Sequence, residues 1–112
     1  MNSNALSLLG LCRKANKLSM GHDMCKGAVN FNKACVCLVS SDSSQRVFDE
    51  FSKLCESKNI PIFRIEPTID EIHHLIGYKA GIITIDDGGF AKSFMKHFKT
   101  EYRPGEETLY DK

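Results

Sequence analysis

The sequence predicts an α/β domain in which one sheet lies between two layers of helices. Amphipathic helical patterns alternate with short apolar runs along the chain, in the order αβαβαβαβα. One of these runs, Ala34–Val39, is apolar throughout, which is typical of a central strand that is covered on both faces. Strands separated by helices need helices on both sides of their sheet, so we expect a three-layer αβα sandwich with four strands.

The first part of the chain predicts a helix and a short strand. Apolar residues recur through Leu6–Cys12 on a broad helical side, and Ser3 or Asn4 can cap this helix. Asn16 suits the left-handed conformation in which helices often end. The strand Leu18–Met20 follows.

Periodicity predicts the next two helices. The second helix covers about His22–Phe31, with polar and apolar residues on different arcs. The apolar strand Ala34–Val39 then leads into a serine-rich loop. Apolar residues at helical spacing predict the third helix over about Ser44–Ser57.

The second half of the chain continues the alternation. The residues Asn59-Ile60-Pro61 stop the third helix, and Thr68 and Glu71 have the spacing of a capping box. The turn Asp86–Gly89 suits a helix cap better than a cation or phosphate site. The predicted elements are the strand Ile62–Ile65, the helix Ile69–Ile76, the strand Ile82–Ile85 and the helix Phe90–Phe98.

Length and composition favour one folded domain. The chain has 112 residues, of which 42% are hydrophobic and 26% charged. We expect a single domain over residues 1–99 and a mobile tail over residues 100–112. No apolar run is long enough to cross a bilayer, and the N-terminus lacks the basic region of a signal peptide, so we expect a cytoplasmic protein.

Basic residues are concentrated in the first third of the chain. The net charge is only +1, but residues 1–41 contain five basic residues and one acidic residue, whereas the rest contains 10 basic and 13 acidic residues. A nearly neutral protein can therefore present a local electropositive face. Chance explains such an uneven composition equally well when composition is considered alone.

The segment Gly21–Lys26 carries the most informative pattern. A glycine ends the first strand, and the second helix begins with His22 and Asp23 and continues to Lys26 one turn later. At about 100° per residue these three side chains share one face. Helix N–H groups and Lys26 attract phosphate or guanine acceptors, and Asp23 can accept hydrogen bonds from guanine, so the segment predicts an RNA site. The alternative is that Asp23 only complements the helix dipole and that Lys26 is solvated.

Three further lysines are candidates for contacts to the RNA backbone. Lys14, Lys17 and Lys33 are expected to flank the same edge of the sheet. Each is also compatible with an ordinary solvated lysine.

The five cysteines are expected to be reduced thiols, because their number is odd and no export signal is present. Cys35 and Cys37 are expected to face one side of a buried strand as small hydrophobes. Although His22 and Cys25 are one helical turn apart, the chain lacks the paired ligand spacing of structural zinc, so we predict no metal site. A thiol-based redox or metal sensor that uses Cys35 and Cys37 stays an alternative.

Four motifs occur in an order that matches a known family. They are the segment Leu8–Gly21, the strand and loop Leu38–Asp42, the residues Asn59–Pro61 and the start of the last helix, Asp87–Lys92. Together they resemble the ribosomal L-seven-Ae family of kink-turn RNA-binding proteins, and in particular its small YlxQ-like bacterial branch. The resemblance covers about residues 5–98.

This resemblance implies a mixed four-stranded sheet and binding to kink-turns, which are sharply bent RNA elements with tandem sheared G·A pairs. In the family, a Gly-Asn-Glu-x-x-Lys motif opens the second helix and contacts the guanines of those pairs. By position, Gly21 and Lys26 match this motif, whereas His22 replaces the asparagine and Asp23 replaces the glutamate.

The resemblance also implies a second contact in the loop before the last strand, about Gly77–Gly81. In this loop, Tyr78 is placed to pack over an extruded base and Lys79 to touch phosphate.

We therefore expect a monomeric, non-enzymatic protein without catalytic residues, cofactor or metal, which recognises a kink-turn or a related internal loop in a ribosome- or translation-associated role. The alternative is a protein-interaction adaptor on the same fold that has lost kink-turn specificity, because His22 and Asp23 depart from the family motif.

Overall fold

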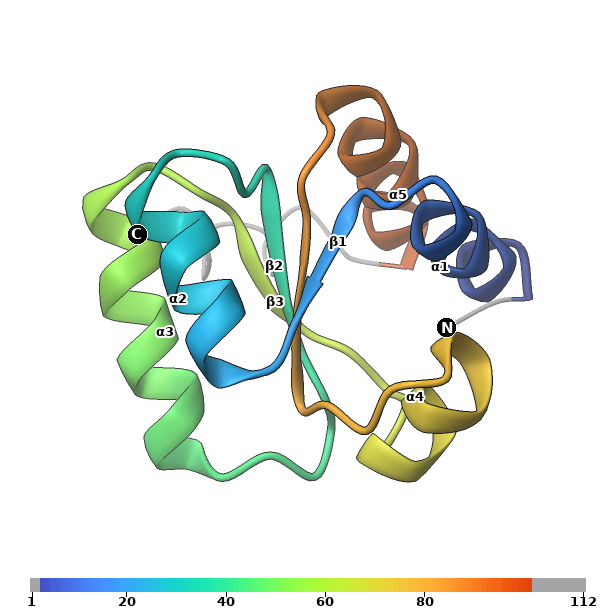
Figure 1. Cartoon of the computed structure of the whole chain (residues 1–112), viewed down its shortest axis with the longest axis horizontal. Helices are drawn as coiled ribbons and strands as arrows, with labels where there is room; N and C mark the ends of the chain where they lie inside the picture. The colour runs from blue at the N-terminus through green and yellow to red at the C-terminus, as the bar shows by residue number, and fades with distance from the viewer. Residues whose placement is uncertain (1–2, 102–112) are drawn as a thin grey trace.

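The structure, a computed structural model, describes residues 3–101, with side chains described for residues 3–97. Helices and strands alternate in the predicted order (Figure 1). The elements are α1 (Ser3–Lys14), β1 (Leu18–Met20), α2 (His22–Asn30), β2 (Val36–Val39), α3 (Gln45–Ser57), β3 (Ile62–Arg64), α4 (Ile69–Ile76), β4 (Ile82–Ile85) and α5 (Gly88–Glu101).

The four strands form one mixed sheet in the order β1-β4-β2-β3. β2 and β3 are parallel, whereas β4 is antiparallel to both β1 and β2. The two central strands, β2 and β4, are buried at every position, because helices cover both of their faces. The sheet confirms the predicted fold class, and it leaves β1 as an edge strand.

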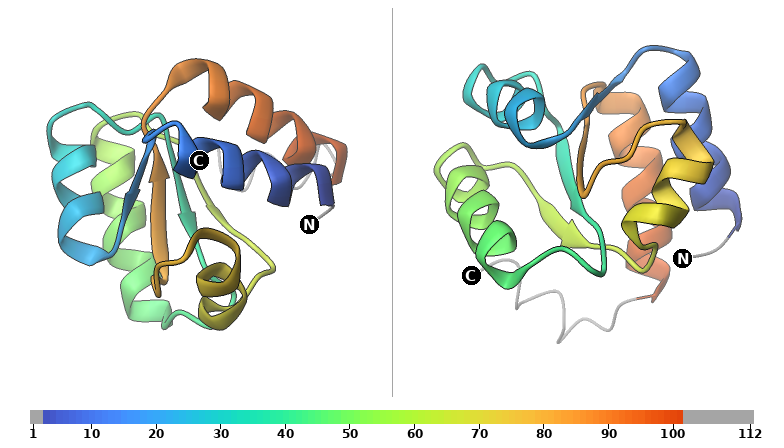
Figure 2. Two further views of the ribbon diagram at one scale, coloured as in Figure 1. Left: turned by 45° about the vertical axis from the view of Figure 1, so that its right-hand side comes forward. Right: turned by 60° about the horizontal axis from the view of Figure 1, so that its bottom comes forward.

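The helices α2 and α3 cover one face of the sheet, and α1, α4 and α5 cover the other (Figures 1 and 2). Under α2 and α3, one core includes the buried side chains of Cys25, Cys37 and Phe51. On the opposite face, beneath α1, α4 and α5, a second core includes Leu9 and Phe94. Each helical layer is therefore fixed to the sheet by its own set of apolar contacts.

Caps and turn residues confirm most predicted boundaries. The strands β1 and β4 and the helix α4 have the predicted ends. Thr68 and Glu71 form the complete capping box, in which each side chain accepts from the other residue's backbone N–H. Asn16 and Asn59 adopt φ angles of 61° and 59°, the left-handed conformation that follows α1 and α3.

The last helix, α5, is longer than predicted. Asp87 Oδ2 accepts a hydrogen bond of 2.9 Å from the Phe90 N–H, so Asp87 caps the helix and the two glycines form its first turn. The helix also contains residues 100 and 101, which the sequence places in the tail, and the rest of the predicted tail lies outside the described residues. Even with 14 residues α5 is short, and no helix in residues 3–101 has the length and apolar character that a bilayer span requires.

Candidate nucleic-acid interface

The start of α2 is held open by Gly21. This residue has φ 91° and ψ 164°, a conformation that is essentially restricted to glycine. Its N–H donates to the Ile82 carbonyl at 2.9 Å, and its carbonyl accepts from the Cys25 N–H at 3.0 Å. No side chain caps the helix here. The N–H groups of the first turn are therefore available to the hydrogen-bond acceptors of a ligand.

The side chains of His22, Asp23 and Lys26 lie together, as the helical spacing predicts. His22 Nδ1 is 3.6 Å from Asp23 Oδ1, and His22 and Lys26 both contact the same residue of α3. Their side chains are 45%, 103% and 48% exposed, respectively. Because all three can be reached from solvent, the group is able to contact a partner.

The residue of α3 that joins this group is Glu50, which the sequence analysis missed. Its Oε1 is 3.1 Å from His22 Nε2 and its Oε2 is 3.6 Å from Lys26 Nζ. The hydrogen bond from His22, together with the positive charge of Lys26, lowers the pKa of the Glu50 carboxyl below its ordinary value. The ring of His22 also packs edge-on against Phe51, with 5.2 Å between the ring centroids, which fixes the imidazole beside Glu50.

The loop Gly77–Gly81 lies beside the start of α2. A Cβ added to Gly21 would be 3.5 Å from Tyr78 Oη, so the tyrosine reaches the first residue of the site. Tyr78 is 45% exposed, and Lys79 is also exposed. The structure thus brings together the two contact regions that the resemblance implies, from parts of the chain that are more than 50 residues apart.

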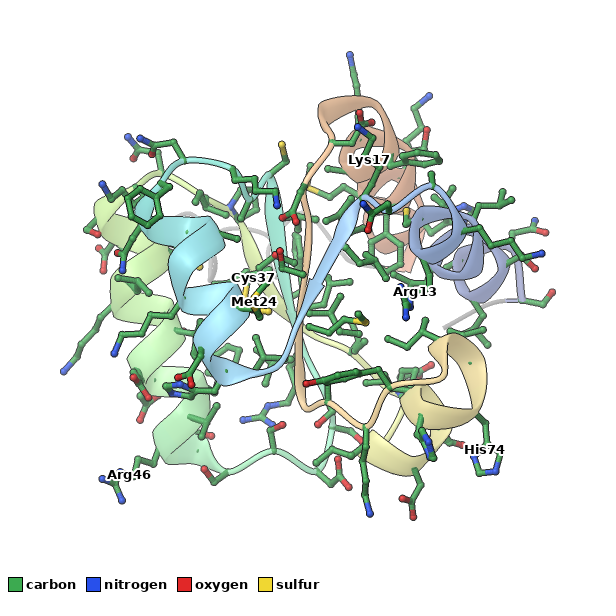
Figure 3. All side chains as sticks on the ribbon, viewed as in Figure 1. Arg13, Lys17, Met24, Cys37, Arg46 and His74 are labelled. Carbon is green, nitrogen blue, oxygen red and sulfur yellow. The ribbon has the colours of Figure 1, made fainter. Side chains whose placement is uncertain are left out.

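Hydrogen bonds from two neighbouring segments hold this loop. Arg13 Nε donates to the Ile76 carbonyl at 3.2 Å, and Figure 3 shows Arg13 between α1 and α4. At the other end of the loop, the Gly81 carbonyl accepts from the Ser40 N–H at 2.8 Å. Gly77 ends α4 in the left-handed conformation, φ 76°. These contacts present Tyr78 at a defined place rather than on a free loop.

The three predicted backbone lysines are exposed but lie apart from the start of α2. Lys33 Nζ is 3.9 Å from Asp86 Oδ2, and the Lys17 carbonyl accepts from the Asp86 N–H, so both lysines lie near Asp86. Figure 3 shows Lys17 at the end of β1 that is far from the start of α2. At about 3.3 Å per residue, Lys17 is roughly 13 Å from Gly21 along the strand. Lys14 ends α1 near the same place. Their role in binding stays a prediction.

The expected arrangement of two cysteines is wrong. β2 begins at Val36, so the period-two alternation of a strand does not extend to Cys35. Cys35 packs against the core under α1, α4 and α5, whereas Cys37 belongs to the core under α2 and α3. Cys37 there contacts Cys55, and the hydrogen bond between the two thiols raises the pKa of Cys37. Among the described residues, no group of three or more potential ligands could hold a metal ion.

The sequence and the fold of this chain are similar to those of known proteins. The chain is 28% identical over 88 residues to the RNA-binding protein YlxQ of Enterococcus faecium, covering 79% of this chain and 84% of that protein. Among solved structures, it resembles a Bacillus halodurans protein of unknown function, with a TM-score of 0.80, 25% identity, and coverage of 85% of this chain and 96% of that chain.

It also shares the fold of a Giardia lamblia 15.5kD RNA binding protein, with a TM-score of 0.73 and 14% identity over 89% of this chain and 92% of that chain. No family model matches the chain. The matches to known proteins confirm the resemblance to the ribosomal L-seven-Ae family. More narrowly, they confirm the resemblance to its YlxQ-like bacterial branch.

Proposed function

We propose that this chain is a non-enzymatic RNA-binding protein that recognises a kink-turn or a related internal loop. The observation that carries the proposal is the placement of Tyr78 beside Gly21, next to exposed His22, Asp23 and Lys26. The proteins similar to this chain include two that are named RNA-binding proteins, which supports the same class of ligand.

The chemistry of the group suits base edges better than phosphate alone. Lys26 and His22 can donate to guanine O6 and N7, while the Asp23 carboxylate can accept from guanine N1–H and N2–H2. A carboxylate would only repel a phosphate, so its presence beside a lysine favours a ligand that offers donors as well as acceptors. The exposed face of Tyr78 is suited to stacking on an extruded base.

The same proposal includes the remaining expectations. Lys14, Lys17 and Lys33 contact the RNA backbone along the β1 edge, and Lys79 contacts phosphate from the loop. The protein acts as a cytoplasmic monomer, needs no cofactor, and has a role associated with the ribosome or with translation.

Binding of a kink-turn RNA by purified protein tests the proposal. We expect a gel shift with a kink-turn RNA at concentrations that leave a matched, unkinked duplex free. Lys26→Ala should weaken kink-turn binding by about 1–3 kcal/mol, because it removes a donor to a guanine. Lys96→Ala, on α5 at the opposite face of the sheet, is the control for general loss of charge. Equal losses from the two substitutions would contradict the site.

A protein-interaction adaptor is the second candidate, and exposed apolar side chains favour it. Met24 lies on α2 and is 63% exposed, and Phe31, directly after the end of α2, is 84% exposed. Exposed large apolar residues are common in contacts with other proteins. If the purified protein shifts neither the kink-turn RNA nor the unkinked duplex in the gel, the result favours the adaptor.

A further inference from the structure

Glu50 of α3 contacts α2, and the RNA-binding function proposed above gives this residue no role. Its carboxylate reaches both of the donors that face a ligand, 3.1 Å from His22 Nε2 and 3.6 Å from Lys26 Nζ. No local sequence pattern places it there, because it comes from a different helix, 28 residues beyond His22.

The net charge of the contacting residues in this group is not the positive charge that a phosphate site needs. Lys26 contributes one positive charge, and Asp23 and Glu50 each contribute one negative charge. The N-terminus of α2 adds about +0.5, so the sum is about −0.5 with an uncharged His22. Even a protonated His22 would leave only a small positive excess.

We propose that Glu50 is a specificity-determining residue, which makes the start of α2 reject plain phosphate and accept only RNA that presents base edges. The proposal rests on the RNA-binding function proposed above. In the free protein, Glu50 holds the donors of His22 and Lys26. A ligand that takes these donors must replace an anionic acceptor and tolerate a neighbouring carboxylate.

A guanine edge meets both requirements and a phosphate does not. Guanine O6 and N7 can replace the carboxylate as acceptors for Lys26, and guanine N1–H and N2–H2 can donate to a carboxylate. A phosphate offers acceptors alone, so both Glu50 and Asp23 repel it. Glu50 therefore weakens binding of a regular duplex more than it weakens binding of a kinked RNA with accessible sheared G·A pairs.

The surroundings of Glu50 make this effect testable by removal of one charge. Arg46 and Lys53 lie one helical turn on either side of Glu50 and are exposed, and Figure 3 shows Arg46 at the first turn of α3, pointing away from α2. Glu50→Gln keeps an oxygen that accepts from His22 and Lys26, but it removes the negative charge that neutralises Lys26. The variant should therefore become a better site for phosphate.

The experiment compares the dissociation constants of a kink-turn RNA and a matched, unkinked duplex. Glu50→Gln should bind the unkinked duplex about three- to tenfold more tightly and the kink-turn less than about twofold more tightly, so the preference for the kink-turn falls. Asp49→Asn is the matched control, because Asp49 is the adjacent exposed carboxylate and its partner is Gln45. It should leave the preference within about twofold of wild type.

A double variant shows whether the effect passes through the site. In a Lys26→Ala background, Glu50→Gln should tighten binding of the duplex less than it does in the wild type, because only the direct repulsion between Glu50 and phosphate is then relieved and the cation that Glu50 neutralises is absent. A gain of the same size without Lys26 would overturn the inference, as would an unchanged preference in Glu50→Gln. Weaker kink-turn binding with unchanged duplex binding would also overturn it, since Glu50 would then position the site or contact the base itself.

These results separate the inference from the function on which it rests. Wild-type protein that binds neither RNA contradicts the proposed function. Wild-type protein that prefers the kink-turn, together with a Glu50→Gln variant that keeps the full preference, contradicts only the role of Glu50.

Discussion

Replacing Gly21 with alanine tests whether backbone geometry holds the start of α2 in place. The residue adopts φ 91° and ψ 164°, which an L-amino acid with a Cβ occupies only under strain. The space around it is adequate, because the added Cβ would meet Tyr78 at 3.5 and 3.7 Å, which are ordinary contacts. The cost of Gly21→Ala should therefore come from backbone strain and not from collision with the tyrosine.

The size of the destabilisation can therefore be worked out from backbone strain alone. A residue forced into such a conformation costs about 1–3 kcal/mol. The smaller entropy of alanine in the unfolded chain offsets only a part of that cost. For a domain of this size, the melting temperature should fall by about 4–12 °C.

Chemical denaturation followed by circular dichroism measures the free energy of unfolding. Gly27→Ala is the matched control, because Gly27 lies inside α2 and a Cβ there would contact nothing within 4 Å. That substitution should stabilise the protein by about 0.5–1 kcal/mol, since alanine is the better helix former. A Gly21→Ala variant as stable as wild type would refute the assignment of strain to this residue.

Two further predictions concern titrating groups. The hydrogen bond from His22 lowers the pKa of Glu50, so this contact stabilises the fold above the ordinary carboxyl pKa, and its contribution is lost as the pH falls through the lowered value. In His22→Ala, NMR titration should find the Glu50 pKa raised toward its ordinary value; an unchanged pKa would contradict the contact. Burial raises the pKa of Cys25 to about 12 and that of Cys12 to about 11, and it also raises the pKa of Cys35. Because Cys35 is half-buried whereas the other four cysteines are buried, alkylation of native protein at neutral pH should modify Cys35 first. Mass spectrometry after brief alkylation checks this order, and early modification of Cys25 would refute it.

Local patterns in the sequence were sufficient to predict most of the fold. The capping box at Thr68 and the left-handed Asn16 depend on residues a few positions away, and both are confirmed. The shared face of His22, Asp23 and Lys26 follows in the same way from helical periodicity. Each of these features is decided within one or two turns of the chain.

Features that depend on the packing of distant elements were not predictable. Glu50 meets His22 only because α2 and α3 pack side by side on one face of the sheet, and no local pattern fixes how two helices cross. The position of Cys35 was missed because β2 begins at Val36, two residues later than predicted.

The single hydrogen bond between the Gly21 N–H and the Ile82 carbonyl lies where the two halves of the proposed recognition surface meet. On one side of it, α2 depends on the core that contains Phe51; on the other, the Tyr78 loop depends on α4 and on Arg13 of α1. Substitutions in one layer can therefore change which nucleotide is favoured while the opposite layer keeps its shape. Such a division allows recognition to diverge stepwise during evolution, without loss of the scaffold.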